Sequence, residues 1–231
     1  MIKSRIAIAG ALLAVTGAAS AAGFSVTPTI ATDYDFRGVS QTNPDQHGLD
    51  PAFQLGVNYG FENGVYLALW GSNVDFGPGD PSLEIDYTAG YAGGDAVESF
   101  GYDFGAIYYT YPSAGAGNTL EIYAGLSKGW FSGKLWLSDD YYSTGNSGYY
   151  LEGNAAIPVP SVEGLSVLAH VGMFDMQHAG SVNDYSIGVG YNVGKFATTL
   201  KYIGGSDNVR DDDSLGNHVV LAVSTTLPWA E

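Results

Sequence analysis

The segment SLEIDYTAGYA, residues 82–92, alternates between apolar side chains and small or polar ones. Leu83 and Ile85 belong to the apolar set, whereas Glu84 and Asp86 belong to the polar set. Successive side chains of a β-strand point to opposite faces, so a period of two predicts a strand with one apolar and one acidic face.

The same alternation recurs along the chain in segments of about ten residues, each followed by residues typical of turns. Transmembrane β-strands need about 9–11 residues at their usual tilt, and these segments have that length. The strands predicted in this way are 25–37, 51–60, 65–76, 82–92, 99–111, 119–128, 130–139, 148–158, 164–174, 184–192, 195–204 and 216–227.

The connections between the predicted strands differ in length in a regular way. The odd-numbered ones include long loops such as 38–50 and 205–215, whereas the even-numbered ones include tight turns such as 61–64 and 193–194. Long loops on one side and short turns on the other are typical of outer-membrane barrels. With both chain ends on the short-turn side, the strand number is even and that side is the periplasm.

Aromatic residues gather near the predicted strand ends, and the strand centres carry mostly aliphatic residues and glycine. Aromatic rings prefer the headgroup level of a membrane, so two belts favour a membrane wall over the core of a soluble β-sandwich. We therefore predict an all-β fold, a transmembrane antiparallel up-and-down β-barrel of about 12 strands. The short-turn belt comprises Tyr59, Phe61, Tyr66, Tyr91, Phe100, Trp130, Tyr191, Phe196 and Trp229, and the outward-facing long-loop belt comprises Tyr34, Phe36, Phe76, Tyr108, Tyr149, Tyr185 and Tyr202.

The N-terminal residues have the features of a secretion signal. Lys3 and Arg5 precede an apolar run, Ile6–Val15, that is about half of the ~20 residues a transmembrane helix needs. We predict a cleavable signal peptide over residues 1–21 and export through the Sec pathway. Residues 22–231 would then form a barrel in the outer membrane of a Gram-negative cell.

Composition narrows the possible partners. The formal net charge is −16 and there is no cysteine, which argues against a basic nucleic-acid surface, a disulfide framework and a thiolate zinc site. Glycine accounts for 33 of 231 residues, about twice the usual ~7%. The expected partners are outer-membrane lipid, lipopolysaccharide and small solutes or ions. No cofactor or metal is predicted, and the oligomeric state stays open.

The alternation also predicts which charged side chains face the lumen. The opposite phase would put Lys or Arg against lipid, at a cost of about 2–4 kcal/mol each near the midplane. In the segment 65–76, the phase that turns Asp75 inward places Leu67 and Leu69 inward and Ser72 outward. The predicted pore-lining residues are Asp33, Asp35, Arg37, Asp75, Glu84, Asp86, Asp103, Glu121, Lys134, Glu152 and Lys201, and His170 is also predicted to face inward.

These charges support two interpretations, and both can hold. Arg37, Lys134 and Lys201 can brace the lumen through ion pairs with carboxylates. Alternatively, the excess of carboxylates can create an aqueous passage that favours cations. Twelve strands lie between the eight that side chains can fill and the sixteen that leave an aqueous channel.

Two other classes of function compete with a channel. A membrane-embedded lipid-modifying enzyme would need an activated serine beside a histidine, but no G-x-S-x-G motif surrounds His47, His170, His178 or His218. We therefore predict no enzymatic activity. A closed structural or adhesive barrel would act through its acidic loops. The carboxylates of the acidic run 207–213 could bind Ca²⁺ or Mg²⁺, but the run lacks the spacing of an EF-hand, which favours a solvated loop tip.

Several segments resemble the TorF family of outer-membrane β-barrel proteins. YDFRGVSQ, residues 34–41, is similar to the first-strand motif of that family. The resemblance covers nearly all of the mature chain and is densest over 31–140. It implies an outer-membrane protein classed as a porin mainly by inference, with no established catalytic site or substrate. The other similar segments are 70–76, 84–87, 105–112, 121–125 and 138–140.

Taken together, these features predict an outer-membrane porin-like channel for passive diffusion of small solutes. An acidic lumen would give it a preference for cations, and Glu84 and Asp86 are expected to contribute to that preference.

Overall fold

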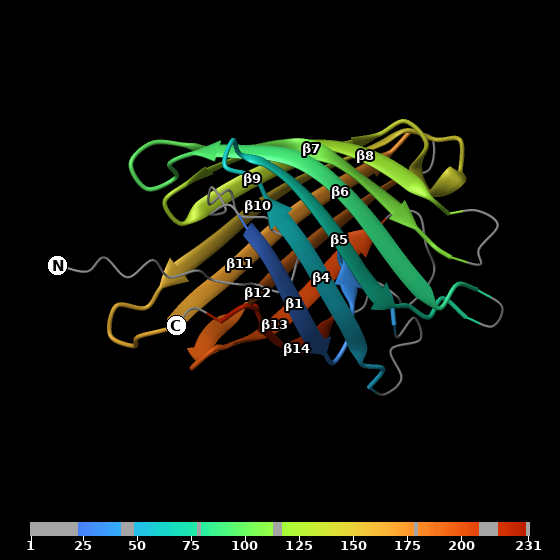
Figure 1. Ribbon diagram of the computed structural model, residues 1–231. Helices are drawn as coiled ribbons and strands as arrows, with labels where there is room; N and C mark the ends of the chain where they lie inside the picture. Colours follow the sequence, from blue (N-terminus) through green and yellow to red (C-terminus); the bar gives the residue numbers. More distant parts are fainter. Residues whose placement is uncertain are drawn as a thin grey trace.

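A computed structural model describes residues 23–42, 49–77, 80–112, 117–177, 180–207 and 217–229. Twelve strands close into one antiparallel barrel, which confirms the predicted fold class (Figure 1). No helix in the described part of the chain is long and apolar enough to cross a membrane. The barrel strands are β1 (Gly23–Ala31), β4 (Ala52–Gly60), β5 (Val65–Asn73), β6 (Leu83–Gly94), β7 (Gly101–Thr110), β8 (Thr119–Lys128), β9 (Phe131–Ser138), β10 (Gly148–Pro158), β11 (Leu165–Met176), β12 (Gly180–Val193), β13 (Phe196–Asp207) and β14 (His218–Thr225).

Within the described ranges, three short elements lie outside the barrel wall. Strands β2 (Asp35–Phe36) and β3 (Val39–Ser40) pair with each other and with no barrel strand, so they form a small separate hairpin. The 3-10 helix η1 (Tyr141–Ser143) lies in the connection between β9 and β10. Each of the twelve predicted wall strands corresponds to one observed barrel strand.

The ring closes at a short seam between the first and last strands. Strand β1 pairs with β4 along its whole length, Gly23–Ala31, but with β14 only over Thr29–Ala31. One isolated bridge, Val26 to Leu227, adds to this seam. The other neighbouring strands follow one another in sequence, as in an up-and-down barrel.

The two ends of the barrel differ as the connection lengths predicted. Strands β8 and β9 are joined by two residues, 129–130, and β12 and β13 by 194–195. Gly129 and Gly194 have φ angles of 60° and 61°, a conformation that favours glycine. Figure 1 shows these turns at the end where β1 begins and β14 ends. The longest connection, residues 32–51, lies at the opposite end.

The outer face of the wall is apolar. Side chains such as Phe104, Ile122 and Ile187 are 51–59% exposed, and they belong to a continuous outward-facing set on all strands. A soluble monomer rarely exposes so large an apolar surface, whereas hydrocarbon solvates it. The belts are present as well, because Trp130 and Tyr191 are exposed at the short-turn ends. Tyr108, Tyr149, Tyr185 and Tyr202 are exposed at the long-loop ends.

The predicted phase of the segment 65–76 is wrong. Leu67 and Leu69 are exposed to the outside, whereas Ser72 is 1% exposed and faces inward. Strand β5 ends at Asn73, so Asp75 lies beyond the strand. The direction of the Asp75 side chain therefore does not indicate which residues of β5 face inward.

Four aromatic residues of the predicted belts also lie elsewhere. Tyr66 is buried and faces inward from β5. Tyr34, Phe36 and Phe76 are buried or half-buried and pack with apolar residues inside the barrel. These rings therefore contribute to a packed interior rather than to the membrane interface.

A matched pair of substitutions tests the assignment of the two faces. Ile187 points outward and its neighbour Ser186 points into the barrel at almost the same depth. We expect Ile187→Arg to lower the free energy of unfolding in lipid vesicles by about 2–4 kcal/mol, because the charge meets hydrocarbon. Ser186→Arg should lower the free energy of unfolding clearly less. Equal costs would contradict the assignment.

Candidate functional site

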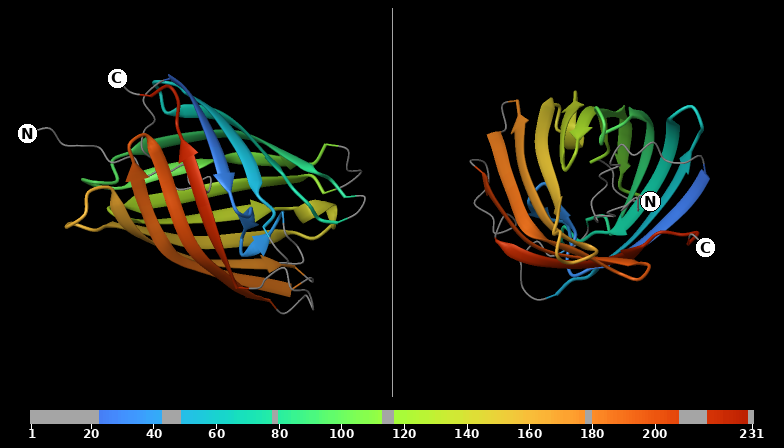
Figure 2. Two further views of the ribbon diagram at one scale, coloured as in Figure 1. Left: turned by 90° about the horizontal axis from the view of Figure 1, so that it is seen from below. Right: turned by 90° about the vertical axis from the view of Figure 1, so that its left-hand side faces the viewer.

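The chain does not continue in the wall after β1 but folds into the barrel. The hairpin β2–β3 turns at Arg37 and Gly38, whose φ angles are 54° and 79°. A Cβ atom on Gly38 would lie 2.6 Å from the Cβ atom of Asp184 on β12, so only glycine allows this approach. We call residues 32–42 the inward hairpin. Figure 2 shows the ring of strands from the end where the chain terminates.

Arg37 anchors the tip of the inward hairpin on the far side of the barrel. Its guanidinium donates two hydrogen bonds to the Glu121 carboxylate, at 2.9 and 2.7 Å. The Tyr109 hydroxyl donates a third, at 3.0 Å. The guanidinium carbon also lies 4.3 Å from the ring centroid of Tyr150 and 5.2 Å from that of Phe174. Cation–π attraction of this kind adds to the bidentate pair.

These contacts make the inward hairpin a bridge across the lumen. It starts at β1 and rejoins the wall at β4, while Arg37 contacts β8, β10 and β11. In a ring of twelve strands ordered as here, β9 lies opposite β1 and β10 lies opposite β4. The hairpin therefore reaches from one wall to the other.

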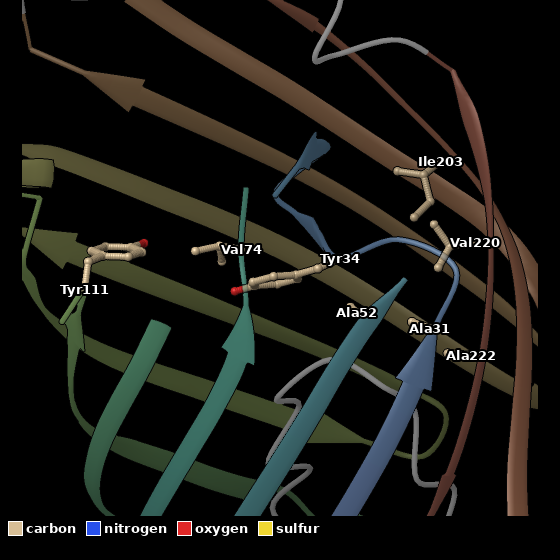
Figure 3. Packing of buried hydrophobic residues seen from close by; sticks show 8 residues of the cluster. All are labelled: Ala31, Tyr34, Ala52, Val74, Tyr111, Ile203, Val220 and Ala222. Carbon is tan, nitrogen blue, oxygen red and sulfur yellow. The ribbon is translucent and has the colours of Figure 1, made fainter. Parts of the chain in front are cut away.

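Apolar side chains fill the space on both sides of this bridge, near the long-loop ends of the strands. Phe36 packs against both clusters, so the inward hairpin joins them. Figure 3 shows the first cluster, with the Tyr34 ring inside the barrel. That cluster comprises Ala31, Tyr34, Ala52, Val74, Tyr111, Ile203, Val220 and Ala222. The second comprises Ile107, Tyr109, Tyr123, Trp136, Tyr150, Phe174 and Val182.

A second ion pair lies on the wall between β7 and β9. The Lys134 ammonium donates to the Asp103 carboxylate at 2.6 Å, and the Tyr66 hydroxyl donates to the same carboxylate at 2.7 Å. The hydroxyls of Tyr66 and Tyr123 are also hydrogen-bonded to each other. The cross-bracing predicted for Arg37 and Lys134 is thus present, and it satisfies two buried carboxylates.

A polar network ties β10, β11 and β12 together. Nε2 of His170 lies 2.7 Å from the Asp184 carboxylate, and its Nδ1 lies 2.7 Å from the Asn154 side-chain oxygen. The Tyr150 hydroxyl lies 3.0 Å from Nε2. Glu152 accepts hydrogen bonds from Trp136 and Asn154, at 2.9 and 3.1 Å. His170 therefore has a carboxylate, an amide and a phenol as partners.

With this geometry established, comparison with protein families gives one assignment. Residues 15–222 match a family described as "Bacterial protein of unknown function (Gcw_chp)". The chain belongs to the Gcw_chp family. The name TorF, expected from the resemblance of several segments, is not supported by this match. A comparison with curated proteins found no match.

Solved structures similar to this Gcw_chp chain include porins. A KdgM porin has 12% sequence identity and a TM-score of 0.56, with 89% of this chain and 99% of the porin covered. A NanC porin has 8% identity and a TM-score of 0.53, with 88% and 98% covered. A KdgM porin in complex with disordered oligogalacturonate has 11% identity and a TM-score of 0.52, with 89% and 99% covered. At these identities, the likeness establishes that the Gcw_chp chain has the fold of a porin barrel.

The structure places most of the predicted lumen residues inside the Gcw_chp barrel. Some of them lie on the inward hairpin and the others lie on the wall strands. Asp33, Asp35 and Arg37 lie on the inward hairpin and not on a wall strand. Asp75 lies beyond the end of β5, where it is exposed and its carboxylate accepts the Gly77 N–H at 3.0 Å. The others face inward from the wall: Glu84, Asp86, Asp103, Glu121, Lys134, Glu152, Lys201 and His170.

Asp33 and Asp35 hold the inward hairpin in shape and connect it to β14. Asp33 accepts hydrogen bonds from the hydroxyls of Ser40 and Thr42, at 2.6 and 2.9 Å. The Asp35 carboxylate accepts the Gly38 N–H at 3.3 Å. Nε2 of His218 on β14 lies 3.4 Å from both carboxylates. These two aspartates therefore stabilise the inward hairpin and do not line the lumen from a wall strand.

Sequence reasoning missed Asp184 and the buried tyrosines. Asp184 shares the inward phase of Ser186 and Gly188, so the alternation of its strand contained the signal. Tyr109 and Tyr150 likewise follow from the phase of their strands. The run 207–213, considered for cation binding, lies mostly outside the described residues.

The inward charges of the Gcw_chp barrel differ greatly in contact with water. Glu84, Asp86, Asp103 and Glu121 are 1–4% exposed. In contrast, another set of inward polar residues, most of them near the strand middles, stays partly exposed: Gln54, Asn58, Thr88, Lys134, Glu152, Asn154, His170, Ser186 and Lys201. The inward polar residues are thus divided between a buried set and a partly exposed set.

Proposed function

We propose that this Gcw_chp protein is a porin-like channel of the Gram-negative outer membrane, through which small solutes diffuse passively past the inward hairpin. The observation that supports it is the contrast between a lipid-compatible outer face and the partly exposed polar residues that line the lumen. The proposal includes the signal peptide 1–21 and Sec export predicted from the sequence. Outer-membrane lipid and lipopolysaccharide would surround the wall.

The inward hairpin would set the size limit of this channel. It crosses from one wall to the other, and Phe36 joins the two apolar clusters beside it. A solute would have to pass at the edges of the hairpin or displace it. The same observation favours a second candidate, a closed structural barrel in which the hairpin never moves.

Recording from single molecules in planar lipid bilayers separates these two candidates. We expect discrete conductance steps from the purified, folded protein. Folding of the same sample is checked by its different electrophoretic migration before and after boiling. If the folded protein gave no conductance step, this result would contradict the proposed channel and favour the closed barrel.

Ion selectivity tests which charges a solute meets. Lys201 and Glu152 are partly exposed, whereas Glu84 and Asp86 are almost completely buried. In a salt gradient, we expect Lys201→Gln to shift the reversal potential toward cation preference and Glu152→Gln to shift it the opposite way. The double variant Glu84→Gln and Asp86→Asn should shift it less. A larger shift from the double variant would show that the passage follows β6.

The same charges suggest a class of solute. One similar structure holds oligogalacturonate, which is a polyanion. This Gcw_chp lumen carries more carboxylates than cations, and two of its cations are engaged by Glu121 and Asp103. We therefore propose neutral or cationic small solutes.

A further inference from the structure

Two carboxyl groups inside the barrel lack the partners that buried charges need. Glu84 and Asp86 are two residues apart on β6, face the same way, and are 2% and 1% exposed. Oδ1 of Asp86 and Oε2 of Glu84 have no hydrogen-bond partner among the described residues. The other Glu84 oxygen accepts a long hydrogen bond, 3.3 Å, from the Tyr111 hydroxyl, and the Tyr34 hydroxyl is a second neutral partner of Glu84.

In the described part of the chain, no basic side chain forms an ion pair with Glu84 or Asp86. Arg37 on the hairpin and Lys134 on β9 are each bound to another carboxylate. Glu121, a third acidic neighbour, adds to the negative potential at Asp86. Buried polar groups are normally paired, and a buried charge without a partner is strongly unfavourable. Either protonation or a positive ion from outside the chain would remove this cost.

We propose that Glu84 and Asp86 bind one divalent hard cation, with Ca²⁺ as the representative ion. Two carboxylates match its charge, and hard cations prefer oxygen ligands. No three His, Cys, Asp or Glu side chains of the described chain form a metal-binding group, so neutral oxygens complete the site. The phenol oxygens of Tyr34 and Tyr111 are the candidates, because both side chains lie beside Glu84. Figure 3 shows their hydroxyl ends pointing toward each other.

Such an ion would connect the inward hairpin to the wall. Tyr34 belongs to the hairpin, whereas Glu84 and Asp86 belong to β6 and Tyr111 follows β7. The ion would thus add a second anchor for the hairpin, on β6. This inference goes beyond the proposed channel and does not depend on it, because a closed barrel would contain the same site.

Calorimetric titration with Ca²⁺ tests the site directly. The protein is refolded in neutral detergent without lipopolysaccharide and stripped with EDTA. Asp211→Asn, Asp212→Asn and Asp213→Asn are present in every sample, so that the acidic run does not bind the ion. We expect one Ca²⁺ per barrel. Glu84→Gln with Asp86→Asn should weaken binding by more than about 100-fold, because loss of even outer-shell partners of metal ligands typically costs 10–100-fold.

Glu152→Gln is the matched control, since it removes one inward carboxylate that already has two hydrogen-bond donors. It should leave Ca²⁺ binding unchanged. The proposal is overturned if the parent protein takes up no Ca²⁺. It is also overturned if the double variant binds Ca²⁺ as tightly as the parent.

A second measurement does not depend on the double variant folding. Tb³⁺, a luminescent substitute for Ca²⁺, emits on excitation of tyrosine only when the ring is close. We expect sensitised emission from the parent protein, its displacement by Ca²⁺, and a clear loss of intensity in Tyr34→Phe. Absence of sensitised emission, or intensity unaffected by Ca²⁺, would contradict a site beside these rings.

Discussion

Replacing residues 33–41 by a short Gly-Ser linker, in a background with Glu121→Gln, is expected to raise single-channel conductance several-fold. The linker removes the bridge across the lumen and, with it, Phe36, which joins the two apolar clusters. Glu121→Gln is included because Glu121 would otherwise be left buried without Arg37. Conductance follows the narrowest part of a passage, so its change reports whether the inward hairpin is that part.

The matched control is the same linker in place of residues 142–146. This segment lies in another connection at the same end of the barrel and is largely exposed. Conductance should stay close to that of the parent protein. If replacement of 33–41 also left it unchanged, while electrophoresis showed a folded barrel, the hairpin would not be the constriction.

The second large effect is expected at the hairpin tip. Arg37→Met should lower the free energy of unfolding by about 3–5 kcal/mol, because it leaves the Glu121 carboxylate buried without its bidentate partner. Denaturant unfolding in lipid vesicles, followed by tryptophan fluorescence, measures this loss. Adding Glu121→Gln should recover most of it, since the uncompensated charge is then gone.

Lys195→Met provides the comparison for this effect. Lys195 lies in the turn between β12 and β13 and is exposed, and exposed substitutions usually change stability by no more than about 0.5 kcal/mol. If Arg37→Met cost no more than Lys195→Met, the pair with Glu121 would not hold the hairpin. If Glu121→Gln gave no recovery, the loss would come from packing around Arg37 rather than from charge.

The wall could be predicted from the sequence because it depends on local alternation. Glu84 and Ile85 differ in chemistry and are neighbours, so their strand has only one phase that keeps charge out of lipid. The same rule failed where the chain leaves the wall. The segment 33–37 alternates as well as any strand, since Asp33 and Asp35 are interleaved with Tyr34 and Phe36. Alternation cannot tell a strand in the ring from a hairpin inside it.

The lumen was predicted only in part for a related reason. The alternation in β6 correctly predicts that Glu84 and Asp86 face inward, but a side chain that faces inward is not necessarily exposed to water. Whether water reaches them depends on residues 32–42, which are distant in sequence and fold over them. The predicted role of Glu84 and Asp86 in ion selectivity depends only on the inward direction of their side chains. Accessibility is a property of tertiary contacts, and no local pattern contains it.

Because the seam between β1 and β14 is short, the inward hairpin contributes to the stability of the closed barrel. Strand β1 pairs with β14 over three residues, Thr29–Ala31, with one further bridge from Val26 to Leu227, and the chain enters the hairpin immediately after Ala31. The hairpin tip is fixed to the opposite wall through Arg37 and Glu121. The first strand is therefore restrained from within, and lateral separation from the last strand would require the tip to come loose. The hairpin that narrows the lumen therefore also helps to hold the first and last strands together at their short seam.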